Sequence, residues 1–325
     1  MINLPQTPDW VHDFPPSVII VLGQTASGKS SFAIELAKLL GSIVICSDAF
    51  QVYRDFSVAT DKILPEEMDG VPHYGFDLVD AGAEFTVKDF LDYTVPLIDF
   101  ELKKGRSPII VGGTHMYIEK LLYTSRLDES PKTVNSIQRS ALNPSVSLHA
   151  ELSSIDPLMA TRLHPNDTRR VCRAIEFFYD NNIRLSDKLM NQNRVLRYEN
   201  TIVLCKRSKS NLEERIRNRI KIKMLNDNKL LDELTRINLQ VEEKKMVWNR
   251  GLLQAIGYKE FDPSLNQSFQ QGVDAMILHT IQYSKKQEKW IRRIKKNINV
   301  FDIENLMDMK NVGFSRLLDS LKWSP

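Results

Sequence analysis

One eight-residue stretch, G-Q-T-A-S-G-K-S at Gly23–Ser30, constrains the fold of this chain more than any other. It matches the phosphate-loop pattern G-x-x-x-x-G-K-S/T at every fixed position. The apolar run Val18–Leu22 before it predicts a buried parallel strand, and Ser31–Leu40 after it places apolar side chains at helical spacing. A strand, a loop and a helix in this order predict an α/β fold in which helices flank a parallel sheet.

The chemistry of this loop predicts a site for a polyphosphate group. Gly23 and Gly28 let the backbone bend so that successive N–H groups point inward, where the following helix adds partial positive charge. The Lys29 ammonium and the Ser30 hydroxyl would then meet phosphate oxygens and Mg²⁺. The pattern does not by itself identify ATP as the ligand, and a chance match in an ordinary strand-to-helix turn is the alternative.

The length and composition favour a globular protein with a main domain and a second lobe. The chain has 325 residues, and no apolar run approaches the roughly 20 residues of a membrane helix. The N-terminal residues show no secretory signal pattern, so we expect a cytoplasmic protein without membrane contact, with a mitochondrial location as the alternative. Only 5 of the 44 Lys and Arg residues lie within residues 1–100, which makes the remainder a candidate surface for a polyanion.

Polar side chains follow the next apolar run. Ile43–Cys46 predicts a second buried strand, and Asp48 and Gln51 come directly after it. In open parallel sheets, ligands bind beyond the carboxyl ends of the strands, so we expect both side chains near the phosphate loop. An isolated Asp at such a position would more often be a turn cap. Beside a phosphate loop we interpret it as a site residue.

A further predicted strand, Ser107–Val111, ends in two glycines, Gly112 and Gly113. A hydrolytic phosphate-loop enzyme usually has Asp or Glu here to hold Mg²⁺ and orient water. Glycines instead let a ligand approach the backbone closely, which favours a substrate slot over a hydrolysis switch. A simple tight turn is the alternative interpretation.

The sheet pattern stops after this strand and returns at Thr201–Cys205. We therefore predict a first part of the core at residues 1–123, a helical insertion at 124–195 and a second part of the core at 196–325. Inside the insertion, a helix start carries three arginines, which oppose the helix dipole. Contacts with nucleic-acid phosphates would explain these residues: Arg169, Arg170 and Arg173.

Two predicted helices near the end of the chain are rich in basic residues. The helix at Leu212–Leu225 contains Arg215 and Arg219, and such a run is usually a solvated face, although here one arginine can point at the phosphate pocket. The helix at Thr280–Lys296 carries seven basic residues against Glu288 alone, which predicts a contact surface for a nucleic-acid backbone.

Taken together, these motifs are similar to one family, the tRNA dimethylallyltransferases, over about residues 18–303. Each motif alone has little specificity, whereas their number and order are highly specific. The similarity rests on G-Q-T-A-S-G-K-S, S-D-A-F-Q-V-Y-R, A-T-D-K, V-P-H-Y, V-G-G-T-H-M-Y, H-P-N-D-T-R-R-V-C-R-A-I-E, A-I-G-Y-K-E and Y-S-K-K-Q-E-K-W.

The resemblance implies a P-loop NTPase-like sheet with a mainly helical insertion domain, and a reaction with two substrates. A dimethylallyl group would pass from dimethylallyl diphosphate to N6 of adenine 37, beside the anticodon of tRNA, with Mg²⁺ as cofactor and a monomeric enzyme. Asp48 would be the general base, Thr114 would touch substrate near the reacting centre, and Arg219 would neutralise the leaving diphosphate.

The resemblance also implies two sets of binding residues. Ser30 would hold the metal, and Gln51 would read the target base. The diphosphate would be bound by Gly23, Thr25, Ala26, Ser27, Gly28, Lys29 and Ser30. The tRNA would be bound by Asp48, Ala49, Phe50, Gln51, Arg169, Arg170, Arg173, Lys285, Lys286, Lys289 and Arg293.

The chain departs from the family pattern at a few positions. A Met-Leu pair is expected four and five residues after the catalytic arginine, whereas Met224 lies five after Arg219, so Arg215 is the alternative for that role. Ile281, Lys286 and Lys289 stand where the pattern has Arg, Arg and Thr. These changes alter individual contacts and keep much of the basic character.

Three other functions remain open at this point. An adenylate isopentenyltransferase would act on free AMP, ADP or ATP, but those relatives usually have G-G-S-N-S where this chain has Gly112–Met116. A small-molecule kinase or ATPase would need the strand-end carboxylate that is missing here. A non-catalytic RNA-binding module would leave the pairing of Asp48 with a phosphate loop unexplained.

Overall fold

The computed structural model describes residues 15–124, 147–190, 195–248, 250–294 and 300–303. The chain divides into two compact units. The first combines Met1–Leu121 with Tyr198–Pro325, and the second is Leu122–Arg197. The chain therefore leaves the first unit after the third predicted strand and returns to it before the strand at 200.

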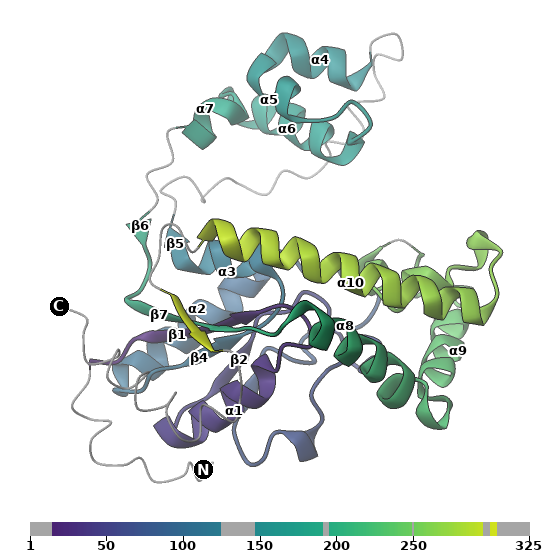
Figure 1. The fold of residues 1–325 in the computed structure, drawn as a ribbon. Helices are drawn as coiled ribbons and strands as arrows, with labels where there is room; N and C mark the ends of the chain where they lie inside the picture. Colours follow the sequence, from purple (N-terminus) through teal and green to yellow (C-terminus); the bar gives the residue numbers. More distant parts are fainter. Residues whose placement is uncertain (1–14, 125–146, 191–194, 249, 295–299, 304–325) are drawn as a thin grey trace. The chain divides into compact units, whose positions relative to one another are not determined.

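Six parallel strands form the central sheet of the first unit, in the order β3-β2-β4-β1-β7-β8 (Figure 1). Ile20 at the centre pairs with Ile110 on one side and Ile202 on the other. This sheet with flanking helices confirms the predicted P-loop-like α/β fold. The strands are β1 (Val18–Gly23), β2 (Val44–Cys46), β3 (His73–Tyr74), β4 (Ile109–Val111), β7 (Asn200–Cys205) and β8 (Val300–Ile303).

Burial on both faces explains why the central strands are continuous apolar runs. All six residues of β1 are buried, as expected for a parallel strand covered by helices. The helix α1 (Lys29–Leu40) follows the phosphate loop and packs Phe32 and Leu36 against Ile19 and Val21 of β1. Gly41, in the left-handed conformation at φ 56°, ends the helix.

Other helices complete the first unit. Thr86 caps α2, because its hydroxyl accepts from the Asp89 N–H while the Asp89 carboxylate accepts from the Thr86 N–H. The predicted helix Leu212–Leu225 begins earlier and changes to a π-helical turn at Arg219–Met224. The helices are α2 (Val87–Lys103), α3 (His115–Leu122), α8 (Lys209–Asn218), α9 (Lys229–Glu242) and α10 (Phe269–Ile294).

The second unit is built from short helices and a two-stranded ribbon. Leu152, Val171 and Ile175 form its core. Asp156 begins α5 by accepting from the Met159 N–H, and its other oxygen accepts from the Ser186 N–H. The elements are β5 (Tyr123–Thr124), α4 (Leu148–Ile155), α5 (Pro157–Arg162), α6 (Thr168–Asn181), α7 (Leu185–Met190) and β6 (Val195–Leu196), with β5 and β6 antiparallel.

A buried carboxylate on α9 holds the loop that leads into the candidate site. Glu233 is fully buried, and its two oxygens accept from the backbone N–H groups of Ser57, Val58 and Ala59 at 2.7–3.0 Å. The Tyr258 hydroxyl also donates to this carboxylate, at 2.8 Å. Because four donors depend on one side chain, Glu233 fixes the start of the 57–62 loop.

We predict that Glu233→Ala lowers the free energy of unfolding by about 3 kcal/mol or more, because four polar hydrogens lose their acceptor. Urea denaturation measures this loss. The control is Glu242→Ala on the exposed side of the same helix, for which a change within about 0.5 kcal/mol is expected. Equal effects of the two substitutions would contradict this role of Glu233.

Candidate active site

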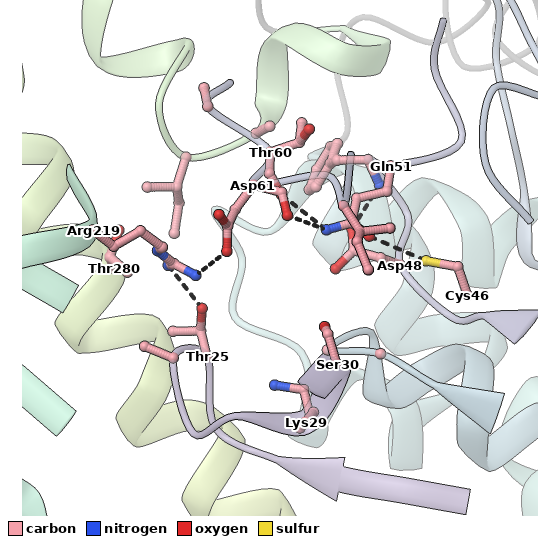
Figure 2. A pocket seen from close by; sticks show the side chains of 18 of the residues that line it. Thr25, Lys29, Ser30, Cys46, Asp48, Gln51, Thr60, Asp61, Arg219 and Thr280 are labelled. Atoms are coloured by element: carbon pink, nitrogen blue, oxygen red, sulfur yellow. Dashed lines mark hydrogen bonds and ion pairs between the residues drawn. The ribbon is translucent and has the colours of Figure 1, made fainter. Parts of the chain in front are cut away.

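A cavity of about 760 Å³ lies in the first unit, at the carboxyl ends of β1, β2 and β4. Figure 2 shows the side chains that face it from several segments far apart in the sequence. Its wall is formed by the phosphate loop, by the residues that follow β2 and β4, and by the π-helical turn. Residues that line it include Thr25, Lys29, Ser30, Asp48, Thr114 and Arg219.

Two glycines of the phosphate loop are required by geometry. Gly23 has a φ of 155°, and a Cβ there would lie 2.6 Å from the Cys205 carbonyl oxygen of the neighbouring strand. Gly28 has a φ of 96° and stands at the N-terminus of α1. Both conformations are easy only for glycine. The loop therefore takes the shape that its sequence predicted, at the N-terminus of a helix.

Three arginines hold successive residues of this loop. The Arg207 Nε donates to the Ser27 carbonyl at 3.3 Å, and the Arg215 Nε donates to the Ala26 carbonyl at 2.8 Å. The Arg219 Nη2 donates to the Thr25 hydroxyl at 2.9 Å. Both candidates for the diphosphate arginine line the cavity. Arg215 contacts a backbone carbonyl of the loop, and Arg219 contacts a side chain of the loop.

Arg219 is held from a second side by a carboxylate. Its Nη1 lies 2.8 Å from the Asp61 Oδ2, and Lys223 lies 3.3 Å from the other Asp61 oxygen. Figure 2 shows Arg219 between Thr25 and Asp61. This arrangement makes Arg219 the better placed of the two arginines to meet an anion in the cavity.

Lys29 gives the cavity an electrostatic preference for anions. Its Nζ donates to the Gln24 carbonyl at 2.8 Å. Burial lowers the pKa of Lys29 to about 8, and the nearby Arg219 charge acts in the same direction. A bound diphosphate would place negative charge beside this ammonium group and so stabilise its protonated form.

Asp48 lies at the end of β2, where the sequence placed it. Burial raises its pKa, whereas hydrogen bonds from the backbone and the charge of Lys29 oppose that rise. Its Oδ1 accepts from the Phe50 N–H at 2.9 Å, so Asp48 is a turn cap as well as a cavity residue. Thr114 supports the same turn, because its hydroxyl accepts from the Ala49 N–H at 2.9 Å.

The structure gives a different reason for Gly112 from the one expected. A Cβ at Gly112 would lie 2.1 Å from the Ser47 carbonyl oxygen, so this glycine allows two strand ends to touch each other. At Gly113 a Cβ would lie 2.9 Å from the Gln287 amide nitrogen and 3.5 Å from an Asp48 oxygen. Both glycines line the cavity, but the close approach at Gly112 is to the protein's own backbone.

The amide of Gln51 is engaged within the protein. Its Nε2 donates to the carbonyl oxygens of Thr60 and Asp61 at 3.0 and 3.2 Å, and the Cys46 thiol donates to its Oε1 at 3.2 Å. Both amide hydrogens therefore have acceptors. For Gln51 to read an adenine, it would have to exchange at least one of these contacts for the base.

The basic residues predicted to bind tRNA lie on two exposed surfaces, one in each unit, whereas Asp48, Phe50 and Gln51 of the same predicted set line the cavity. On α6 the first turns expose Arg169, Arg170 and Arg173, and Arg170 pairs with Asp167 at 3.4 Å. On α10 the outward side exposes Lys285, Lys286, Lys289 and Arg293.

Sequence reasoning missed Gln287 and Asp61. Gln287 is only 1% exposed, and its amide contacts both the phosphate loop and the end of β4. A helical repeat through Ser284, Gln287 and Ile291 places it on the buried face of α10, and this signal was available. The Asp61 contact with Arg219 spans 158 residues and left no pattern in the sequence.

One side chain in the cavity wall offers an oxygen of the kind that Mg²⁺ binds. No group of three His, Cys, Asp or Glu side chains suited to a metal exists among the described residues. Ser30 provides an exposed hydroxyl oxygen in the wall of the cavity. Mg²⁺ usually takes few protein ligands together with substrate phosphate oxygens, and one hydroxyl beside a diphosphate site fits that preference.

The fold and the cavity define a phosphate-loop α/β protein whose anion site adjoins a carboxylate. The family model described as IPP transferase matches residues 51–294, and the model described as isopentenyl transferase matches residues 16–74. None of the helices in the described ranges has the length and apolarity of a bilayer-spanning segment.

Known proteins give a closer comparison. A tRNA dimethylallyltransferase of Staphylococcus aureus (strain bovine RF122 / ET3-1) is 33% identical over 302 residues, which cover 90% of this chain and 94% of the relative. A eukaryotic dimethylallyltransferase, solved acting on tRNA, has a TM-score of 0.83 at 29% identity and covers 95% of this chain and 80% of its own. The tRNA isopentenylpyrophosphate transferase of Bacillus halodurans has a TM-score of 0.67 at 30% identity, with 94% and 96% covered. The chain belongs to the tRNA dimethylallyltransferase family.

A histidine next to the site has an unusual environment. His115 stacks on Trp290 with ring centroids 4.1 Å apart and the ring planes 8° from parallel. Its Nε2 is buried and has no hydrogen-bond partner within the described ranges. Burial lowers the pKa of His115 to about 4, and the charges of Lys29 and Arg293 act in the same direction.

This environment makes stability depend on pH. Between pH 4 and about 6.5, the unfolded chain binds a proton at His115 that the folded chain does not. The free energy of unfolding therefore rises with pH through this window. We predict that His115→Phe, which keeps the ring and removes the titration, gains stability relative to wild type as pH falls from 7 to 5.

Urea denaturation at several pH values measures this difference. The exposed Met116 provides the control substitution, Met116→Leu, which removes no titrating group and should show no such trend. If the difference between His115→Phe and wild type stays constant from pH 7 to 5, this account of His115 is wrong.

Proposed function

We propose that this enzyme transfers the dimethylallyl group of dimethylallyl diphosphate to N6 of adenine 37 in tRNA and releases diphosphate. One observation carries the proposal: a diphosphate cradle and a carboxylate with a raised pKa line the same cavity. Membership of the tRNA dimethylallyltransferase family supports it. The monomeric state and the cytoplasmic location expected from the sequence stay predictions.

On the donor side, the phosphate loop and Arg219 bind the diphosphate and stabilise it as a leaving group. The bond between C1 of the dimethylallyl group and the diphosphate oxygen breaks, so negative charge grows on that oxygen. Lys29, the backbone N–H groups of the phosphate loop and Arg219 meet this charge. Ser30 would hold Mg²⁺, which would supply further charge neutralisation there.

On the acceptor side, Asp48 takes a proton from the adenine N6 amine as nitrogen bonds to C1. This removes the positive charge that would otherwise remain on the alkylated nitrogen. Burial raises the pKa of Asp48, which makes its carboxylate a stronger base. Thr114 holds the turn that carries Asp48 and lines the cavity beside it.

Two features favour tRNA over a free nucleotide as acceptor. The curated relatives and the solved structures that resemble this chain are named for their action on tRNA. The exposed basic residues on α6 and α10 provide contacts for a nucleic-acid backbone. A base inside the anticodon loop would have to leave its stack to reach Asp48, as in other enzymes that act on bases.

The direct test supplies labelled dimethylallyl diphosphate and Mg²⁺ with three acceptors: tRNA with adenine at position 37, the same tRNA with guanine there, and AMP. We expect label in the first acceptor alone. Label in AMP with a kcat/KM equal to or above that for tRNA would replace the proposal with the free-nucleotide alternative.

The assignment of Asp48 gives a separate prediction. Asp48→Asn should lower kcat for transfer by about 10²-fold to 10⁴-fold, the usual contribution of a general base. The Kd for tRNA, measured by filter binding, should change less than about threefold. The control is Asp92→Asn on the exposed side of α2, which should keep wild-type kcat. A loss of tRNA binding equal to the loss of transfer would contradict the assignment.

A further inference from the structure

A buried glutamine on α10 joins two walls of the cavity. The Gln287 Oε1 accepts from the Thr25 N–H at 2.7 Å, and its Nε2 donates to the Gly113 carbonyl at 3.2 Å. Thr25 belongs to the phosphate loop, and Gly113 follows β4 beside Asp48. One amide thus connects the donor side of the site to the acceptor side.

Neighbouring residues of α10 strengthen both connections. The Gln24 side chain donates to the Ser284 carbonyl at 3.1 Å, and the Tyr283 hydroxyl donates to the Gly113 carbonyl at 2.8 Å. The inward side of this helix therefore contacts the phosphate loop twice and the β4 end twice. Any displacement of this part of α10 changes the geometry of both.

The opposite side of the same helical turns is basic and exposed. Over two turns of α10, the exposed residues include Lys285, Lys286 and Lys289. Ser284 and Gln287 of the same turns are buried. A polyanion that binds the exposed side acts on the helix segment that holds the cavity walls. Both sets of residues belong to the same turns of α10, so a shift of these turns would move both sides together.

Gln287 also contacts the backbone of the anion-binding loop. A phosphate loop binds anions through its backbone N–H groups. Near the start of this loop, the Thr25 N–H donates to the amide oxygen of Gln287. The orientation of this peptide unit sets the direction of the N–H groups that follow. Gln287 thereby holds the Thr25 peptide unit of the phosphate loop.

We propose that Gln287 is a positioning residue that couples RNA binding on the exposed side of α10 to diphosphate binding in the phosphate loop. The inference rests on the proposed function, since it takes tRNA and a diphosphate as the two ligands. RNA on α10 favours the helix position in which Gln287 bonds both Thr25 and Gly113, and so raises the affinity for diphosphate. By linkage, diphosphate raises the affinity for RNA by the same factor.

The experiment measures the Kd of inorganic diphosphate with Mg²⁺ by calorimetry, with and without a saturating anticodon stem-loop RNA that carries adenine 37. In wild type we expect RNA to tighten diphosphate binding about tenfold, which corresponds to about 1.4 kcal/mol. Gln287→Met keeps the length of the side chain and removes both hydrogen bonds. In this variant, the factor by which RNA tightens diphosphate binding should fall below about twofold.

Two further variants separate coupling from folding. Gln282→Met makes the same change at an exposed position of α10 and should keep the wild-type factor. Gln287→Asn keeps the amide but is too short to reach both partners, and should also lose coupling; circular dichroism and urea midpoints verify that each variant folds. In steady state, Gln287→Met should raise KM for dimethylallyl diphosphate about tenfold and change kcat less than about threefold.

The outcomes distinguish this inference from the proposed function. If wild type transfers label to tRNA but RNA does not change the Kd of diphosphate, the coupling is absent and the inference is overturned. Equal coupling factors in wild type and in folded Gln287 variants overturn it as well. If wild type transfers no label to tRNA, the proposed function fails first and the inference fails with it.

Discussion

The carboxyl ends of the central strands pack so closely that neither Gly23 nor Gly112 has room for a side chain. A Cβ at Gly23 would meet the Cys205 carbonyl, and one at Gly112 would meet the Ser47 carbonyl. This close packing places the phosphate loop of β1, the Asp48 turn of β2 and the Thr114 turn of β4 around one cavity. The phosphate loop and the Asp48 turn, to which we assign the two substrates, lie side by side because backbone meets backbone at these two glycines.

The charges around this cavity suit a leaving anion. Lys29 has a pKa lowered to about 8, and Arg219 is held between Thr25 and the Asp61 carboxylate. Asp61 gives the arginine a partner within the protein, so its guanidinium is oriented by protein contacts alone. A site with cations already in place needs little rearrangement as charge develops on a departing diphosphate, which is the condition for electrostatic catalysis.

Local sequence predicted the parts of the site that depend on neighbouring residues. The loop pattern and the apolar strands need only short-range information, and the structure contains both. The two-residue strand β3 was missed because His73–Tyr74 is too short for a periodic pattern. The contacts of Gln287 with Thr25 span 262 residues. Such contacts follow from the way segments pack, so a single sequence does not reveal them.

In the proposed reaction the phosphate loop holds diphosphate as a leaving group and has no need of ATP as a phosphoryl donor. The most direct measurement counts products in a single reaction of tRNA with dimethylallyl diphosphate and Mg²⁺, with ATP omitted and then added. We expect one diphosphate to be released per dimethylallyl group transferred, with no effect of ATP. Transfer that requires ATP, or ATP hydrolysis that accompanies each transfer, would contradict it.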